Sequence, residues 1–169
     1  RGTAATLKGS DVPAELAVPA LIKALADEQW QVRHEAANAL AYYGEEAEDA
    51  VSNLVTALQD KEWQVRNAVA MALTKMPNTE AIPALANALA DQQWHVAANA
   101  AMALANSGPD ANSALENLVQ ALDHEQWHVR NGAAYALGSI GNQDAIDALR
   151  ARLNDAEETV VETATSALA

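Results

Sequence analysis

The stretch DEQWQVRHEAANAL, residues 27–40, recurs three more times along the chain. The other copies are DKEWQVRNAVAMAL (60–73), DQQWHVAANAAMAL (91–104) and HEQWHVRNGAAYAL (124–137). Each copy carries one tryptophan at the same place, at positions 30, 63, 94 and 127, so a longer spacing alternates with a slightly shorter one. A nearly constant period of this length is typical of repeat proteins in which each unit packs only on its neighbours. The pattern therefore predicts a stack of helical repeats.

The composition supports closely packed helices. Half of the 169 residues are hydrophobic, 41 are alanine and none is phenylalanine. Alanine has the highest helix propensity and lets neighbouring helix backbones approach one another. The absence of cysteine excludes disulfides, thiolate catalysis and cysteine-ligated metals. We expect no membrane span and see no signal peptide, and a soluble cytoplasmic protein is the default expectation, although a cysteine-free chain suits any compartment.

The chain is strongly acidic. It has 23 acidic and 10 basic residues, which gives a formal charge of −13. We expect no nucleic-acid ligand, because phosphate binding requires a basic stripe. A basic or neutral protein partner suits this charge better. The acidic surface also keeps an alanine-rich stack in solution, and we take this as its main role.

Turn signals divide the chain into five pairs of helices. The signals are Gly44, Pro77-Asn78, Gly108-Pro109 and Gly141-Asn142. We expect an N-terminal arm at 1–11 and a single repeat domain at 12–169. The predicted repeats are 12–43, 44–76, 77–107, 108–140 and 141–169. In the fifth copy, DAEETVVETATSAL (155–168), Glu158 replaces the tryptophan, which is explained either by a terminal cap or by simple drift.

The alternating spacing indicates an older duplication. The shift along the chain that superposes NLVTAL (53–58) on NLVQAL (117–122) also places Trp30 on Trp94 and Trp63 on Trp127. The array therefore looks like a duplicated pair of repeats.

The D-x-x-W-x-V-R-x-x-A-A-x-A-L pattern, followed by AIPALANAL (81–89) or AIDALRARL (145–153), resembles HEAT repeats. The closest type is the bacterial HEAT-like repeat first named from phycobilisome lyases. The resemblance implies an all-α fold, an α-solenoid of about five helical hairpins. It also implies a ladder between repeats, formed by the aspartate and by the arginine six residues later.

Two copies fit that ladder, with Asp27 and Arg33 in one and Asp60 and Arg66 in the next. The ladder is partly broken further on, where Ala97 replaces the arginine and His124 replaces the aspartate. We interpret these residues as structural. The aspartate is expected to cap the second helix of the repeat, and the arginine to connect adjacent turns.

Two stripes run along each second helix. One is small and aliphatic and is expected to point into the stack, as Val32, Ala36 and Leu40 do in the first copy. The other begins at each tryptophan and advances by four residues. It consists of Trp30, His34, Asn38 and Tyr42, then Trp63, Asn67, Met71 and Lys75, then Trp94, Ala98, Met102 and Asn106, then Trp127, Asn131, Tyr135 and Ser139. We call this second set the tryptophan stripe. Its aromatic, amide and thioether side chains are typical of surfaces that recognise partners.

We expect the tryptophan stripe to bind a protein or an extended peptide. The resemblance places the second helices on the concave face of the array, where tryptophans about 8–10 Å apart would leave slots for a guest. The candidate binding residues are Trp30, His34, Trp63, Asn67, Met71, Trp94, Met102, Trp127, Asn131 and Tyr135.

The W-x-x-x-N pairs at 63–67 and 127–131 resemble the ladder of armadillo-repeat importin-alpha, whose tryptophan rings hold basic side chains and whose asparagines hold the peptide backbone. That likeness favours a basic guest. The alternative is that each tryptophan packs over the start of its helix.

We expect no catalytic residue, no metal and no cofactor. Residues 124–128 spell the zinc-protease pattern H-E-x-x-H, but the same slots hold DEQWQ, DKEWQ and DQQWH in the other copies. The segment is therefore a drifted copy of a structural element. Arg33-His34-Glu35-Ala36 resembles one element of deoxyhypusine hydroxylase, a HEAT-repeat di-iron enzyme, but the other elements of that site are missing.

Three functional hypotheses follow. The first is a non-enzymatic scaffold or adaptor that binds a protein or peptide through the tryptophan stripe. The second is a bilin-lyase-like accessory subunit that binds a tetrapyrrole or its client protein. The lyases act on a cysteine of the client, so the lack of cysteine here is no objection. The third is a structural segment of a larger protein, since the chain begins at Arg1 and stops within an apolar pattern.

Overall fold

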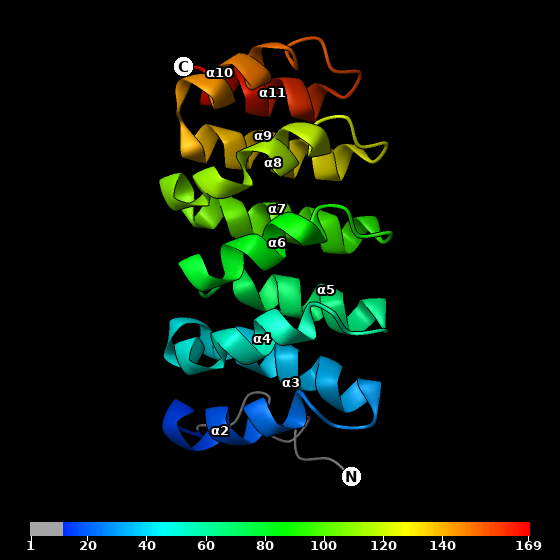
Figure 1. The fold of residues 1–169 in the computed structure, drawn as a ribbon, viewed down its shortest axis with the longest axis vertical. Helices are drawn as coiled ribbons and strands as arrows, with labels where there is room; N and C mark the ends of the chain where they lie inside the picture. Colours follow the sequence, from blue (N-terminus) through cyan, green and yellow to red (C-terminus); the bar gives the residue numbers. More distant parts are fainter. Residues whose placement is uncertain (1–11) are drawn as a thin grey trace. The chain divides into compact units, whose positions relative to one another are not determined.

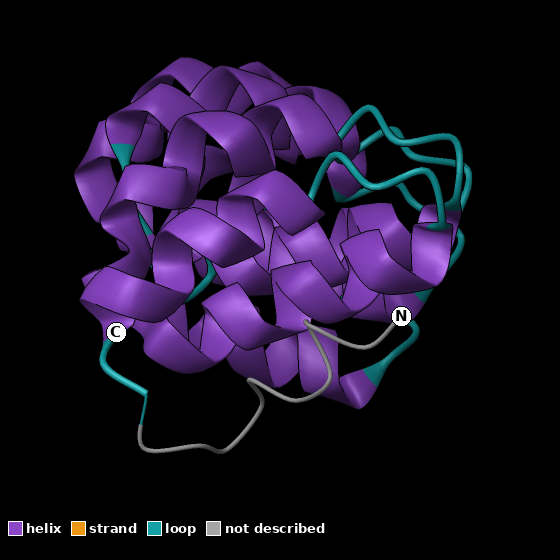
Figure 2. Ribbon diagram, turned by 90° about the horizontal axis from the view of Figure 1, so that it is seen from below, coloured by secondary structure: helices purple, strands orange, loops and turns teal. Residues whose placement is uncertain are grey.

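The computed structural model describes residues 12–169, so the predicted arm at 1–11 lies outside the described residues. Every regular element of the described part is a helix, and no strand occurs in it (Figure 2). The predicted all-α fold of helical hairpins is therefore confirmed. The chain divides into two compact units, Arg1–Ala81 and Ile82–Ala169, which we call the N-terminal and the C-terminal unit. The prediction of one continuous domain over 12–169 stays a prediction.

The N-terminal unit consists of two helical hairpins. Its elements are α2 (Ala14–Ala24), α3 (Trp30–Tyr43), η1 (Gly44–Ala50), α4 (Val51–Ala57), α5 (Trp63–Leu73) and η2 (Thr79–Ala81), where η marks a 3-10 helix. The α-helices are labelled in Figure 1. Helix α2 packs on α3 and α4 packs on α5, and the second helices α3 and α5 lie against each other. Each hairpin thus buries its apolar side against its neighbour.

The C-terminal unit consists of three hairpins. Its elements are α6 (Ile82–Ala88), α7 (Trp94–Asn106), η3 (Gly108–Ala114), α8 (Leu115–Ala121), α9 (Trp127–Ile140), α10 (Gln143–Arg150) and α11 (Glu158–Ala167). The second helices α7, α9 and α11 pack in a row, and the first helices α6, α8 and α10 form another (Figure 1). Each of the predicted second helices begins at the tryptophan or, in the fifth copy, at its replacement Glu158.

The aliphatic stripe forms the core, as the spacing predicts. Its buried members are Ala36, Leu40, Val65, Val69, Leu73, Val96, Ala100, Leu104, Val129, Ala133 and Leu137, each at most 1% exposed, while Val32 is half-buried. Small side chains let these helices come close. At Gly132, on α9, an added Cβ would lie 2.9 Å from the Cβ of Ala101 on α7, so this position requires glycine unless a helix shifts.

The first helices of the second and fourth repeats are split into two elements. In each of these repeats a seven-residue 3-10 segment, η1 or η3, comes before the α-helix, α4 or α8, starts. Gly44 and Gly108 open these segments with φ angles of 56° and 57°, a conformation that favours glycine. The shorter connections instead contain Asn78, followed by only the three-residue η2, and Asn142, followed directly by α10. This difference accounts for the alternation between the longer and the shorter tryptophan spacing.

Candidate functional site

The loop before each second helix is built by one repeated turn. The carboxylate of Asp27 accepts the backbone N–H of Gln29 at 2.8 Å, and the same bond joins Asp60 to Glu62, Asp91 to Gln93 and Asp155 to Glu157. In the fourth repeat the Nδ1 atom of His124 accepts the N–H of Gln126 at 3.0 Å. His124 therefore takes the structural place of the aspartate, as expected for a drifted copy.

The expected capping role of these aspartates needs correction. Gln29 is the N-cap residue of α3, and neither it nor its counterparts caps the helix through a side chain. Asp27 lies two residues before that N-cap. Its carboxylate therefore reaches the N–H of the N-cap residue itself instead of an N–H of the first helical turn.

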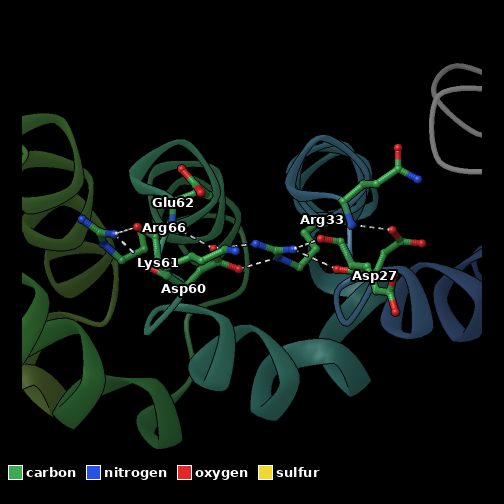
Figure 3. Close-up of polar contacts among 8 residues, drawn as sticks. Asp27, Arg33, Asp60, Lys61, Glu62 and Arg66 are labelled. Atoms are coloured by element: carbon green, nitrogen blue, oxygen red, sulfur yellow. Dashed lines mark hydrogen bonds and ion pairs between the residues drawn. The ribbon is translucent and has the colours of Figure 1, made fainter.

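The arginine forms the expected ladder between repeats by pairing with the aspartate of the following repeat. Arg33 donates from Nε and Nη2 to the two carboxylate oxygens of Asp60, at 2.5 and 2.8 Å (Figure 3). Its Nη1 atom donates to the carbonyls of Asp27 and Glu28, at 2.8 and 3.1 Å. Arg66 likewise donates to the carbonyl of Asp60 at 2.8 Å. One guanidinium thus ties its own loop to the next one.

The same arrangement exists in the C-terminal unit, where the sequence suggests a broken ladder. Arg130 donates to both oxygens of Asp155, at 2.8 and 2.7 Å, and to the carbonyl of His124 at 2.9 Å. Asp123, one residue before the expected position, instead pairs with Arg152 at 2.6 Å. The fourth repeat therefore keeps its ion pair with the next repeat, because Arg130 binds Asp155 of the fifth repeat and needs no aspartate in its own repeat.

Burial and hydrogen bonding set the charge states of these pairs. Burial raises the pKa of Asp60, but the hydrogen bonds from Arg33 and from the N–H of Glu62 together lower it by more than burial raises it. The pKa therefore lies below its ordinary value. The pKa of Asp155 is lowered chiefly by its hydrogen bonds from Arg130. The pKa of each arginine is raised by its carboxylate partner. These ion pairs are structural, and we assign them no binding role.

The tryptophan stripe of the N-terminal unit lies at the surface. Tyr42, Trp63 and Met71 are 66%, 36% and 38% exposed, and Trp30, His34 and Asn67 are half-buried. The ring of Trp30 meets His34 edge to face, with centroids 6.3 Å apart. Every predicted site residue of this unit is therefore accessible to a partner, although some already contact one another.

In the C-terminal unit the two tryptophans of the stripe belong to a column of four stacked rings. Trp94 lies between two imidazoles, with centroids 3.6 Å from His95 and 4.5 Å from His128. His128 in turn stacks on Trp127 at 3.7 Å, and all three pairs are within 24° of parallel. The order is His95, Trp94, His128, Trp127. The expectation of an open slot between these two tryptophans is therefore wrong, because the imidazole of His128 occupies it.

Sequence reasoning did not identify His128 in this role. The Nδ1 atom of its ring is buried and has no hydrogen-bond partner among the described residues. A signal was present, because the dipeptide Trp-His occurs at 94–95 and 127–128, where the first two copies have Trp-Gln. The residue after each tryptophan does not belong to the set spaced by four residues, so the helical spacing did not indicate a role for His128.

The remaining site residues of this unit are Met102 on α7 and Asn131 and Tyr135 on α9. Met102 and Tyr135 are 37% and 49% exposed. Asn131 is half-buried, and its amide oxygen accepts the hydroxyl of Thr163 at 2.6 Å. One lone pair of the amide oxygen is thus used within the protein, while its second lone pair and the NH2 group can still pair with a peptide backbone. Thr163 adjoins Glu162, which would have been found by continuing the four-residue stripe from Glu158 into the fifth copy.

Within residues 12–169, no group of three or more histidine, aspartate or glutamate side chains is placed to hold a metal ion. In the H-E-x-x-H segment, His124 is engaged in a turn and His128 in the ring column. Among the helices of the described part, none is long and apolar enough to cross a membrane.

Comparison with known proteins identifies the repeat. The sequence profile of HEAT repeats matches residues 18–105 and again residues 82–169. The chain belongs to the HEAT-repeat family. The shift from the start of the first HEAT match to the start of the second is the one that carries Trp30 to Trp94, so the two matches fall on the two halves of the duplication. Among curated proteins, none matches this HEAT-repeat chain.

Several solved structures share the arrangement of these HEAT repeats. One engineered protein is 28% identical, with a TM-score of 0.74 over 93% of this chain and 83% of that one. The complex of CpcE and CpcF of phycocyanin lyase from Nostoc sp. PCC7120 includes a chain that is 28% identical, with a TM-score of 0.76. That match covers 95% of this chain but 65% of the lyase chain.

A designed armadillo repeat protein in complex with the peptide (KR)4 is also similar, with a TM-score of 0.78 over 98% of this chain and 88% of that one. Its identity is 23%, so this likeness concerns the fold alone. The predicted α-solenoid class is confirmed by these neighbours. A fold of this kind commonly serves as a protein-binding scaffold.

Proposed function

We propose that this HEAT-repeat chain is a non-enzymatic scaffold that binds a protein or an extended basic peptide along the tryptophan stripe. The proposal rests on the positions of the exposed large hydrophobic residues. Eight large hydrophobic residues are exposed in the described part, and five of them belong to the stripe: Tyr42, Trp63, Met71, Met102 and Tyr135. Since aromatic and methionine side chains at a surface are enriched where partners bind, this register favours recognition over packing.

The chemistry of the stripe favours a basic guest. Aromatic faces attract cations, and the side-chain amides of Asn67 and Asn131 can hydrogen-bond to an extended backbone. The formal charge of −13 attracts a cationic partner over a longer range. The designed armadillo neighbour binds a peptide of alternating lysine and arginine, which is compatible with this chemistry on a related stack of helices.

A matched pair of variants tests the proposal. Met102 on α7 and Val119 on α8 are both 37% exposed, but Met102 belongs to the stripe and Val119 to a first helix. A peptide array probed with wild type, Trp63→Ala, Met102→Ala and Val119→Ala is expected to show basic hits that weaken in the first two variants and persist in the third. Equal binding by all four folded proteins would contradict the proposal, and the tryptophans would then be packing residues.

A second candidate is supported by the lyase neighbour. The identity of 28% over 95% of this chain makes an accessory role beside a bilin lyase a specific alternative. Such a subunit would hold a tetrapyrrole or its client protein. Mixing the chain with a free bilin tests this idea directly. A shift of the visible absorbance band that is lost in Trp63→Ala would favour the alternative, and an unchanged spectrum would count against pigment binding.

A further inference from the structure

An open cavity lies between α9 and α11 in the C-terminal unit. Its volume is about 590 Å³, and its lining includes Tyr135, Gly138, Ser139, Glu162, Thr163 and Ser166. Four of these, Tyr135 and Ser139 on α9 and Glu162 and Ser166 on α11, follow the four-residue spacing of the tryptophan stripe in the fourth and fifth copies. The cavity therefore continues the stripe from the fourth copy into the fifth.

Two hydroxyls of the cavity are left as acceptors by their own hydrogen bonds. The hydroxyl of Thr163 donates its proton to the amide oxygen of Asn131 at 2.6 Å. The hydroxyl of Ser139 donates its proton to the carbonyl of Tyr135 at 3.1 Å. A hydroxyl has one proton and two lone pairs, so both oxygens can now only accept. Glu162 adds an exposed carboxylate, and no basic side chain lines the cavity.

These features select a guest that donates hydrogen bonds and carries positive charge. The ring of Tyr135, 49% exposed, offers a flat face at the cavity wall. A guanidinium group is planar, has five N–H donors and stacks on aromatic faces, whereas an ammonium group is a compact point charge with three donors. A carboxylate beside an aromatic face and several hydroxyl acceptors therefore suits arginine better than lysine.

We propose that this cavity binds an arginine side chain of the partner, with the guanidinium paired to Glu162 and stacked on Tyr135. The proposal rests on the scaffold function and gives it a specificity pocket. Ser139 and Thr163 complete the hydrogen bonds from their acceptor oxygens. The arginine of the guest then binds between α9 and α11, while the rest of the stripe binds the neighbouring residues of the guest.

A minimal probe tests the cavity alone. Nα-acetyl-arginine methylamide is titrated into the full chain, and the amide resonance of Gly138 and the ring resonances of Tyr135 are followed by NMR. Shifts at both residues are expected. The dissociation constant should rise about fivefold or more in Glu162→Gln, the effect of losing one exposed charge-assisted contact. The charge-matched control Glu116→Gln, on the exposed side of α8, should leave the constant unchanged.

The corresponding citrulline and lysine probes separate shape from charge. Citrulline, which is planar but uncharged, should bind at least about fivefold more weakly than arginine, because it loses the same ion pair, and lysine should also bind more weakly than arginine. Equal effects of Glu162→Gln and Glu116→Gln, equal binding of citrulline and arginine, or no shift at Gly138 and Tyr135 would each overturn the inference.

The failure of this inference is distinguishable from failure of the scaffold proposal. Array hits that depend on Trp63 but ignore Glu162 would retain the scaffold and remove the pocket. Arginine-probe binding that depends on Glu162, with no peptide hits on the array, would retain the pocket and remove the scaffold.

Discussion

The imidazole of His128 on α9 stacks on the indole of Trp94 on α7, with ring centroids 4.5 Å apart. The contact therefore joins the second helices of two successive repeats. The other face of the imidazole lies against Trp127 at 3.7 Å. A histidine of the protein thus occupies the position between two tryptophans that a guest side chain would need. Binding in that position requires His128 to move, so the exposed edge of the column and the residues beyond it are better placed to meet a partner.

Replacing His128 by alanine should loosen the contact between α7 and α9. Two stacked ring contacts are lost, and each aromatic pair contributes about 0.5–1.5 kcal/mol beyond its buried area. We expect a lower free energy of unfolding and a weaker near-ultraviolet circular dichroism signal from the indoles. His95→Ala, at the exposed end of the column, is the control and should have the smaller effect. An equal loss of stability in the two variants would show that stacking between two tryptophans contributes no more to stability than the single stacked contact of His95.

The ladder of ion pairs should make stability depend on acid pH. The pKa of Asp60 is lowered in the folded chain, so its ionised form stabilises the fold at neutral pH. This contribution is fully present above the ordinary aspartate value of about 3.9 and is lost as the pH falls below it through the folded value.

Asp60→Asn should therefore lower the free energy of unfolding by about 2–3 kcal/mol at pH 7, since it removes charge-assisted bonds in a poorly exposed pair. The difference from wild type should shrink below about pH 3.9. Asp147→Asn removes an exposed pair with Arg150 and is the control, for which we expect almost no change. A pH-independent difference between Asp60→Asn and wild type would contradict the assignment.

Two methionines near the end of α5 separate binding from packing. Met71 is 38% exposed on the stripe, and Met76, just after the helix, is 2% exposed. Met76→Ala should cost about 2–5 kcal/mol, as for other buried truncations, whereas Met71→Ala should stay within about 0.5 kcal/mol of wild type. Thermal or urea unfolding measures both. Met71→Ala should nevertheless weaken partner binding, and a variant that binds normally would remove Met71 from the site.

The effect on stability of replacing Gly108, which opens η3, should depend only on how readily the new residue adopts a positive φ angle. Gly108 has a φ of 57°, and an added Cβ would meet nothing within 4 Å. Gly108→Ala should therefore lower stability by about 1–2 kcal/mol, the cost of a left-handed conformation for an ordinary residue. Gly108→Asn should cost less, because asparagine adopts this region more readily. Equal stability of alanine and glycine here would show that the turn can relax.

The sequence by itself determined the repeats, the helices and the buried stripe. Leu40, Leu73, Leu104 and Leu137 recur in register, and their burial follows from the 3.6-residue turn of a helix, which is a local property of the chain. The positions of the second helices followed in the same way, because the tryptophan motif marks each start. The candidate stripe was also readable, since its residues share one helix face.

Only the tertiary structure decided which side chains meet across repeats. The resemblance implied a ladder between repeats, but only the structure shows its partners, with Arg33 bound to the carboxylate of Asp60 in the following repeat. Likewise, His128 entered the space between two indoles, and the carboxylate of Glu162 came to line one cavity with Tyr135. These contacts depend on the distance and rotation between successive helices, which are set by the packing of whole hairpins. No periodicity along a single helix encodes that geometry, so the proposed binding surface takes its final form only when the repeats stack.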